Sequence, residues 1–260
     1  MAEFPPWLFP LFATVAGLVV GSFLNVVVHR LPRGMSLLRP RSHCPNCLIP
    51  VVWYDNVPIL SYVFLAGRCR HCRAPISWRY PLLEALSGLW FCASAVLSHN
   101  LSVFFHAVIF GCLCLALAFI DLEHLILPDV LTLPGLGLGL LWTVLGGPIR
   151  VRDALWGLGL GVAIPLAIFW VYRLLRGVEG MGLGDVKLLG MFGAFLGWRG
   201  MLLSLGLGAV MGALVGVGLV LGKKASQRSE LPFGTFLCAA ALVVRWWGAE
   251  LWQALFSVPP

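Results

Sequence analysis

Two aspartates stand at the edges of long apolar segments, where a charge is costly and therefore marks a candidate functional site. Asp121 ends the apolar run 103–120, and Asp185 opens the run 186–198. Two carboxyl groups within hydrogen-bonding distance cannot both ionise cheaply, so they share one proton. The ionised group can then take a proton from water while the protonated group polarises a carbonyl. If the two segments meet, Asp121 and Asp185 could hydrolyse a peptide bond.

Three residues around Asp185 could support such a pair. Gly182 and Gly184 have no side chains, so we expect them to let the backbone approach a facing helix and to adopt positive φ. Lys187 could stabilise an ionised aspartate or extend its charge to the membrane surface. Taken singly, Asp121 could also be a solvated residue at a helix end and Asp185 a helix N-cap.

Four cysteines form two C-x-x-C pairs in one loop, Cys44 with Cys47 and Cys69 with Cys72. Their spacing is close to that of a zinc ribbon, in which two tight turns supply four thiolates to one tetrahedral ion. Four protein ligands leave no open position for water, so the zinc would be structural. The alternative is a pair of disulfides, which a reducing cytoplasm disfavours. His43 or His71 could also replace one cysteine.

The elements that must position these residues are membrane helices. Of 260 residues, 60% are hydrophobic and 11% are charged, and the mean hydropathy is +0.92, which excludes an ordinary cytosolic enzyme. Polar interruptions recur at about 20 residues, the length that crosses a bilayer as a helix. We predict an all-α polytopic membrane protein with about eight transmembrane helices, near residues 8–29, 83–98, 103–120, 130–147, 154–172, 186–198, 200–221 and 233–256.

The placement of Lys and Arg predicts the orientation in the membrane. If the cysteine loop is inside, most cations lie on its side, which identifies that side as the cytoplasm. Asp121 and Asp185 then arrive at the same cytoplasmic face. The cations on that side are Arg30, Arg33, Arg39, Arg41, Arg68, Arg70, Arg73, Arg79, Arg173, Arg176, Lys187, Lys223, Lys224 and Arg228. The opposite side receives Arg150, Arg152, Arg199 and Arg245.

Glycine strings inside the predicted spans could serve packing or phosphate binding. One string begins at Gly135, and others begin at Gly157 and Gly206. Glycine-rich loops that bind phosphates follow a strand and precede a helix, whereas these glycines lie within apolar spans. We therefore expect them to allow transmembrane helices to approach closely.

With these motifs in place, the chain resembles the type IV prepilin peptidase family, which consists of membrane aspartic endopeptidases with a GxGD motif. The resemblance covers nearly the whole chain. One departure is Thr235, where we expect proline, and we attach no chemical consequence to it. The matching segments are 21–32, both cysteine pairs, 56–62, 67–81, Phe119-Ile-Asp121, Leu127-Pro128-Asp129, Gly182-Leu-Gly184-Asp185 and 231–236.

The resemblance implies that Asp121 and Asp185 are catalytic in a multi-pass protein of the bacterial inner membrane, with the active site facing the cytoplasm. The implied substrates are type IV prepilins or type II secretion pseudopilins; membrane lipid is a further partner, and nucleic acid is not. We expect acidic Glu123, Asp129 or Glu179 to contact the basic leader of the substrate. Many members also methylate the new N-terminus with S-adenosylmethionine, although no residue here indicates where that cofactor binds.

We expect three parts in this chain. Residues 1–29 form the first transmembrane helix, residues 30–80 a small zinc-ribbon-like cytoplasmic loop domain, and residues 81–260 a transmembrane aspartic peptidase core. The alternative is a non-enzymatic ion-coupled transporter or channel, whose acids relay ions and whose zinc-bound loop docks a partner. An intramembrane protease for other substrates is a third possibility.

Overall fold

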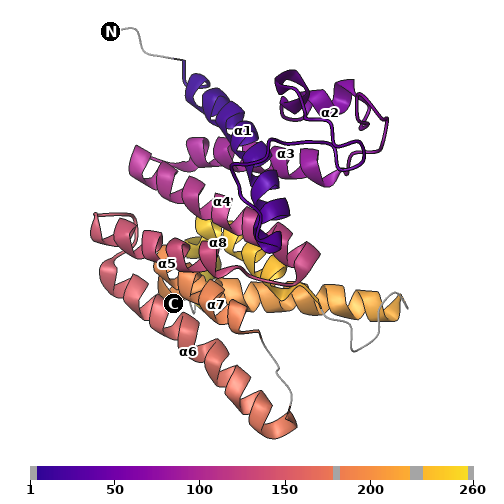
Figure 1. The fold of residues 1–260 in the computed structure, drawn as a ribbon. Coiled ribbons are helices and arrows are strands. Elements are labelled where there is room, and N and C mark those ends of the chain that lie inside the picture. Colours follow the sequence, from indigo (N-terminus) through magenta and orange to yellow (C-terminus); the bar gives the residue numbers. More distant parts are fainter. Residues whose placement is uncertain (1–4, 178–181, 223–230, 257–260) are drawn as a thin grey trace. The chain divides into compact units, whose positions relative to one another are not determined.

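The computed structural model describes residues 5–177, 182–222 and 231–256, and most of this length is helical (Figure 1). No strand occurs in these ranges apart from two isolated bridges, so the all-α prediction is confirmed. Glu179, Lys223, Lys224 and Arg228 lie outside the described residues. The helices are α1 (Leu8–Arg30), η1 (Leu31–Arg33), η2 (Trp53–Asn56), α2 (Leu60–Phe64), α3 (Arg79–Leu97), α4 (Leu101–His124), α5 (Asp129–Val144), α6 (Val151–Arg176), α7 (Leu183–Leu221) and α8 (Phe233–Phe256).

Each predicted span coincides with a helical segment, and the sixth and seventh spans are the two parts of α7, on either side of Gly197, whose backbone is not helical. Within the described ranges, five helices are long and apolar enough to cross a membrane, namely α1 with η1, α3, α4, α6 and α7. Fewer helices than the expected eight meet this criterion. Two predicted spans are counted once in α7, α5 has only 16 residues, and α8 is not among the helices that meet the criterion. The multi-pass character is confirmed.

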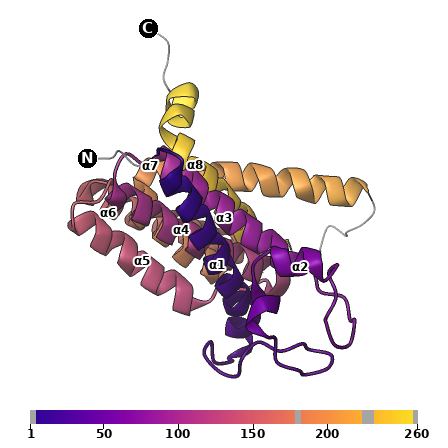
Figure 2. The same cartoon turned by 90° about the horizontal axis from the view of Figure 1, so that it is seen from above.

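The chain forms two compact units, Met1–Phe104 and Phe105–Pro260. In the first unit, α1 and α3 lie side by side (Figure 2). A Cβ atom added to Gly17 would lie 2.7 Å from Cβ of Phe91, and one added to Gly21 would lie 2.7 Å from Cα of Glu84. The two helices can approach this closely because α1 presents glycines spaced four residues apart to α3.

In the second unit, the glycine strings of α5 and α6 pack against α7, as predicted. A Cβ on Gly157 would lie 2.6 Å from the backbone of α7, and one on Gly161 would meet the backbone carbonyl of Leu189 in the same helix. Nothing lies within 4 Å of Gly159, the middle residue of the string. Gly135 and Gly139 of α5 likewise pack against α7. The alternation follows from the helical repeat, which places residues i and i+4 on one face.

α7 bends at Gly197, whose backbone has φ 70° and ψ 177°, a conformation essentially restricted to glycine. In a straight helix, Gly184 and Gly212 would be about 42 Å apart. Instead, Gly184 packs on Leu127, Leu127 also packs on the beginning of α8, and Gly212 packs on the same part of α8. α7 therefore folds back at Gly197, next to the predicted break between the sixth and seventh spans.

Candidate active site

The apolar core of the second unit aligns α4 with the first part of α7. The ring of His106 lies 5.1 Å from that of Phe195, and the ring of Phe110 lies 5.8 Å from that of Phe192. The two helices therefore run antiparallel. Continuing along α4 leads to Asp121, and going back along α7 leads to Asp185, so both aspartates reach the same end of the core.

Asp121 is buried near the end of α4, with only 5% of its surface exposed. Its Oδ2 accepts a hydrogen bond of 2.7 Å from the backbone N–H of Thr235, at the beginning of α8. The Thr235 hydroxyl lies 3.1 Å from the same oxygen and 2.9 Å from the carbonyl of Ala118. Because it has one hydrogen, it donates to one acceptor at a time. A Cβ on Gly234 would lie 3.1 Å from Asp121 Oδ2, so the carboxyl group rests directly on the start of α8.

Asp185 is buried in the first turn of α7, with 8% of its surface exposed. Its backbone N–H donates to the carbonyl of Gly182 at 3.1 Å. Leu127 lies 3.1 Å from the Cβ position of Gly184, next to Asp185, and 3.1 Å from that of Gly234, which contacts Asp121. The structure therefore brings the two predicted residues to the same part of the core. The alternative interpretations, a solvated residue at a helix end for Asp121 and a helix N-cap for Asp185, are met only in position. Asp121 lies near the end of α4, and Asp185 lies in the first turn of α7.

The predicted positive φ of Gly182 and Gly184 is wrong. Gly182 has φ −72° and Gly184 is an ordinary helical residue, because α7 already begins at Leu183. The predicted close approach does occur at Gly184, where an added Cβ would lie 3.1 Å from Cβ of Leu127. Leu127 also lies 3.1 Å from the Cβ position of Gly234. Its side chain therefore fills the space between the beginnings of α7 and α8, a role that the sequence did not reveal.

Lys187 pairs with an acid outside this pair. Its Nζ lies 2.6 Å and 2.7 Å from the two carboxylate oxygens of Asp129, the first residue of α5. The ion pair is exposed and links α7 to α5. Glu123 has His124 Nε2 at 3.9 Å, and Glu179 lies outside the described residues. Asp129 thus has a partner within the chain already.

The four cysteines of the loop form one cluster in the first unit. All four are free thiols, and their sulfur atoms lie within 4.8 Å of one another. Cys44 Sγ and Cys72 Sγ are 3.7 Å apart. Sulfur atoms around tetrahedral zinc with bonds of 2.3 Å are about 3.8 Å apart. The donor set and its spacing therefore fit a metal ion, and the alternative of two disulfides is not what the structure contains.

The two cysteine pairs sit in matching turns. Cys44 N–H donates to the carbonyl of Ile49 at 3.0 Å, and Cys69 N–H donates to that of Ala74 at 2.9 Å. In each turn the residue after the second cysteine is left-handed, with φ 60° at Leu48 and 58° at Arg73. One isolated bridge closes each turn, His43 with Pro50 and Arg68 with Pro75.

Hydrogen-bond donors near the four cysteines favour the thiolate form of Cys72. A neighbouring ion pair connects parts of the loop. The backbone N–H of Ala74, helped by the Asn46 side chain, lowers the pKa of Cys72 to about 6, which suits a metal ligand. Arg70 forms a two-pronged ion pair with Asp55, and the hydrogen bonds from Arg70 lower the pKa of that carboxyl group. This pair connects the second turn to η2.

A further contact that the sequence did not reveal ties the loop to the membrane helices. Buried Glu84 in α3 accepts a hydrogen bond of 2.8 Å from the backbone N–H of Ile59. Ile59 precedes α2 and has φ 60°. Glu84 therefore satisfies an amide group of the loop.

The fold and the site define a class: a multi-pass helical membrane protein with two buried aspartates at helix ends and a four-cysteine cluster that could hold a metal ion. Residues 15–98 match the family model described as "Bacterial Peptidase A24 N-terminal domain", and residues 108–217 match "Type IV leader peptidase family". The chain belongs to the type IV leader peptidase family.

Similar curated proteins carry the name "Prepilin leader peptidase/N-methyltransferase". The protein from Aeromonas hydrophila is 40% identical over 270 residues, which covers 95% of this chain and 93% of the relative. Those from Stutzerimonas stutzeri and Pseudomonas aeruginosa are 37% and 36% identical, with the same coverage. No solved structure matches the chain.

Proposed function

We propose that this protein is a membrane aspartic endopeptidase that removes the leader peptide of type IV prepilins or type II secretion pseudopilins, with Asp121 and Asp185 as its catalytic pair. The observation that carries the proposal is the convergence of these two buried acids from α4 and α7. Family membership and the names of the relatives support the substrate class.

The contacts of each aspartate suggest its role in the reaction. Thr235 orients the carboxylate of Asp121 through Oδ2, and in this proposal Oδ1 takes a proton from the attacking water. The protonated Asp185 donates a hydrogen bond to the carbonyl oxygen of the scissile bond, so that negative charge on that oxygen is stabilised. Water oxygen bonds to the carbonyl carbon, the C–N bond breaks, and the leaving nitrogen receives a proton from the pair.

Three residues near Asp185 support the catalytic pair by fixing the position of the beginning of α7. Gly184 admits Leu127 beside the aspartates, and Gly182 lies next to the carboxyl group of Asp185. Lys187 fixes the beginning of α7 by pairing with Asp129. We assign these three residues to positioning rather than to proton transfer.

The proposed location is the bacterial inner membrane, with the catalytic pair at the cytoplasmic face. The distribution of arginines supports this orientation. The proposed surroundings of the helices are membrane lipid, and nucleic acid is not among the proposed partners.

We propose that Cys44, Cys47, Cys69 and Cys72 bind a structural zinc ion in a loop domain of residues 30–80, apart from the first span (1–29) and the peptidase core (81–260). Four sulfur donors at the observed spacing suit zinc. The ion would cross-link two turns and leave no position for a reacting water.

A methyl transfer from S-adenosylmethionine to the newly exposed N-terminus is also proposed, on the names of the relatives alone. The mass of the mature pilin tests it, because N-methylation adds one methyl group to the processed form. A processed but unmethylated product would reject the proposed methyl transfer and would leave the peptidase proposal unaffected.

The peptidase proposal is tested by co-expression with a prepilin in cells that lack their own peptidase, with leader removal read by mass. Asp121→Asn and Asp185→Asn should each lower cleavage about 10³-fold or more, with membrane insertion and zinc content unchanged. Glu250→Gln, an exposed acid on α8, should cleave normally. Full cleavage by either aspartate variant would reject the pair, and ion flux without any cleavage would favour the transporter.

A further inference from the structure

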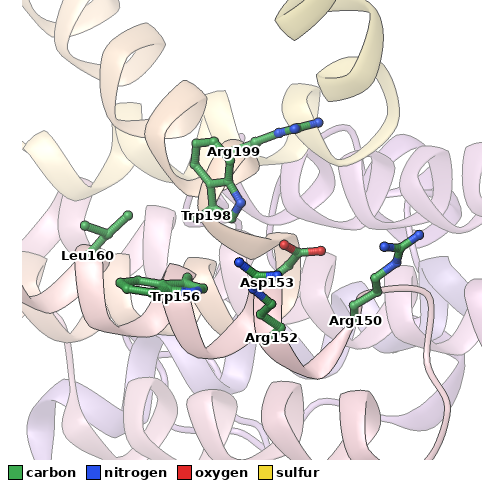
Figure 3. A pocket seen from close by; sticks show the side chains of 7 residues that line it. All are labelled: Arg150, Arg152, Asp153, Trp156, Leu160, Trp198 and Arg199. Carbon is green, nitrogen blue, oxygen red and sulfur yellow. The ribbon is translucent and has the colours of Figure 1, made fainter.

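A pocket of about 450 Å³ lies in the second unit at the end opposite the aspartates (Figure 3). From Asp185 to the bend at Gly197, α7 is about 18 Å long, and the pocket adjoins this bend. Figure 3 shows Arg152 and Asp153 at the beginning of α6, Arg150 just before them, and Arg199 on the neighbouring α7. Two segments that are distant in the sequence thus supply its basic side chains.

The charges of the pocket are unbalanced. Three guanidinium groups, those of Arg150, Arg152 and Arg199, line it together with one carboxylate, that of Asp153. In the part of the chain that the structure describes, no ion pair joins these arginines to an acid. The three arginine side chains are exposed, and an anion bound among them would offset their mutual repulsion.

The distribution of cations along the whole chain makes this gathering unusual. Only four cations fall on this side of the membrane by sequence, and three of them line the pocket. This side of the membrane receives few Lys and Arg residues, yet three of them lie at one place. They come from two segments that are distant in the sequence.

The uncharged lining indicates what kind of anion the pocket suits. Trp156, with 58% of its surface exposed, and Leu160 continue the pocket along the apolar side of α6. The guanidinium of Arg199 stacks on Trp198 at 5.2 Å and on Trp252 at 5.6 Å. Tryptophan is typical of the headgroup level of a bilayer, and arginine binds phosphate through two parallel hydrogen bonds.

We propose that this pocket binds the phosphate of an anionic phospholipid headgroup, with the acyl chains lying along Trp156 and Leu160. A free phosphate ion offers the same oxygens to the arginines but has nothing to place against the apolar wall. The site is separate from the aspartates, and it stands whether or not the proposed peptidase activity is correct.

The test uses the full chain in a neutral detergent, with binding measured by thermal unfolding and by native mass spectrometry. The probes are dihexanoylphosphatidylglycerol, dihexanoylphosphatidylcholine and sodium phosphate. We expect the phosphatidylglycerol to raise the Tm and to bind as one retained molecule. Arg152→Gln and Arg199→Gln should each weaken its binding about tenfold or more.

Arg173→Gln is the matched control, because Arg173 lies on the same helix, stacks on Phe169 and Trp170, and is outside the pocket. It should bind phosphatidylglycerol like the unchanged protein. Arg199→Lys keeps the positive charge and should lose less affinity for phosphatidylglycerol than Arg199→Gln. This difference separates the loss of the charge from a general folding defect. Equal binding of phosphatidylcholine, equal stabilisation by sodium phosphate, or unchanged affinity in both pocket variants would each overturn the proposal.

Discussion

Thr235 illustrates how a single residue can matter without belonging to a recognisable motif. It stands where the resemblance leads us to expect proline, and it donates a hydrogen bond to Asp121, a contact that gives this departure a structural role. Proline has no backbone N–H and no hydroxyl group, so it could supply neither donor. The contact spans 114 positions of the chain, which is why no local pattern could predict it.

Replacement of Thr235 tests this contact. Thr235→Val keeps the backbone donor and loses the hydroxyl group, so we expect kcat for prepilin cleavage to fall about three- to tenfold with little change in KM. Thr235→Ser should restore most of the rate. Steady-state kinetics with a purified prepilin give both constants. A valine variant with unchanged kcat, or a serine variant as slow as valine, would show that the hydroxyl group is not used.

At the level of elements, the sequence predicted the helices well because hydropathy and length are local properties. It also placed the break between the sixth and seventh spans next to Gly197. The return of α7 toward the aspartates was not predictable, since it follows from contacts of Leu127 with the beginnings of both α7 and α8. The bend divides α7 into two helical segments, the first of which carries Asp185 in its first turn. It also lets the second segment return to the beginning of α8 at Gly212.

Gly197→Ala should therefore destabilise the second unit. An alanine at φ 70° and ψ 177° costs about 1–3 kcal/mol, which a lower Tm in detergent would reveal. Gly206→Ala is the control, because Gly206 is helical and nothing lies within 4 Å of its Cβ position. Equal Tm values for the two variants would mean that the bend at Gly197 carries no strain for other residues.

For the whole molecule, the two family models follow the two compact units, with matches at 15–98 and 108–217 and units that divide after Phe104. The cysteine cluster was predictable because each pair of ligands is local and the spacing alone limits the geometry. The aspartates were predictable as a pair through the scarcity of acids, only 11 in 260 residues. The contacts of Glu84 and Leu127 were not, because they join distant segments.

Acid should dismantle the cysteine loop in two steps. Zinc is expected to leave first, since its thiolate ligands take up protons at higher pH than carboxylates do. Arg70 lowers the pKa of Asp55 in the folded loop. The ion pair therefore stabilises the folded loop fully at pH values above the pKa of Asp55 in the unfolded chain, which is about 3.9. This stabilisation is lost as the pH falls through the lower pKa that Asp55 has in the folded loop. A zinc-sensitive dye measures the release of zinc, and limited proteolysis measures the opening of the loop when the ion pair is lost.

Asp55→Asn should abolish the second step and leave zinc release at its original pH. If zinc and the protease-resistant loop were lost together in the unchanged protein, the ion pair would have no stabilising effect of its own. Cys72→Ser should lower the zinc content at neutral pH, while the loop keeps its resistance to protease as long as the pair of Arg70 with Asp55 is intact.

The matching turns around Cys44 and Cys69 have a consequence for how the loop is held together. In both, the bridge, the hydrogen bond and the left-handed residue recur in the same order. Each turn supplies only two of the four sulfur donors, so neither can complete a tetrahedral shell alone. A metal ion bound there would join two segments that are 25 residues apart in the sequence.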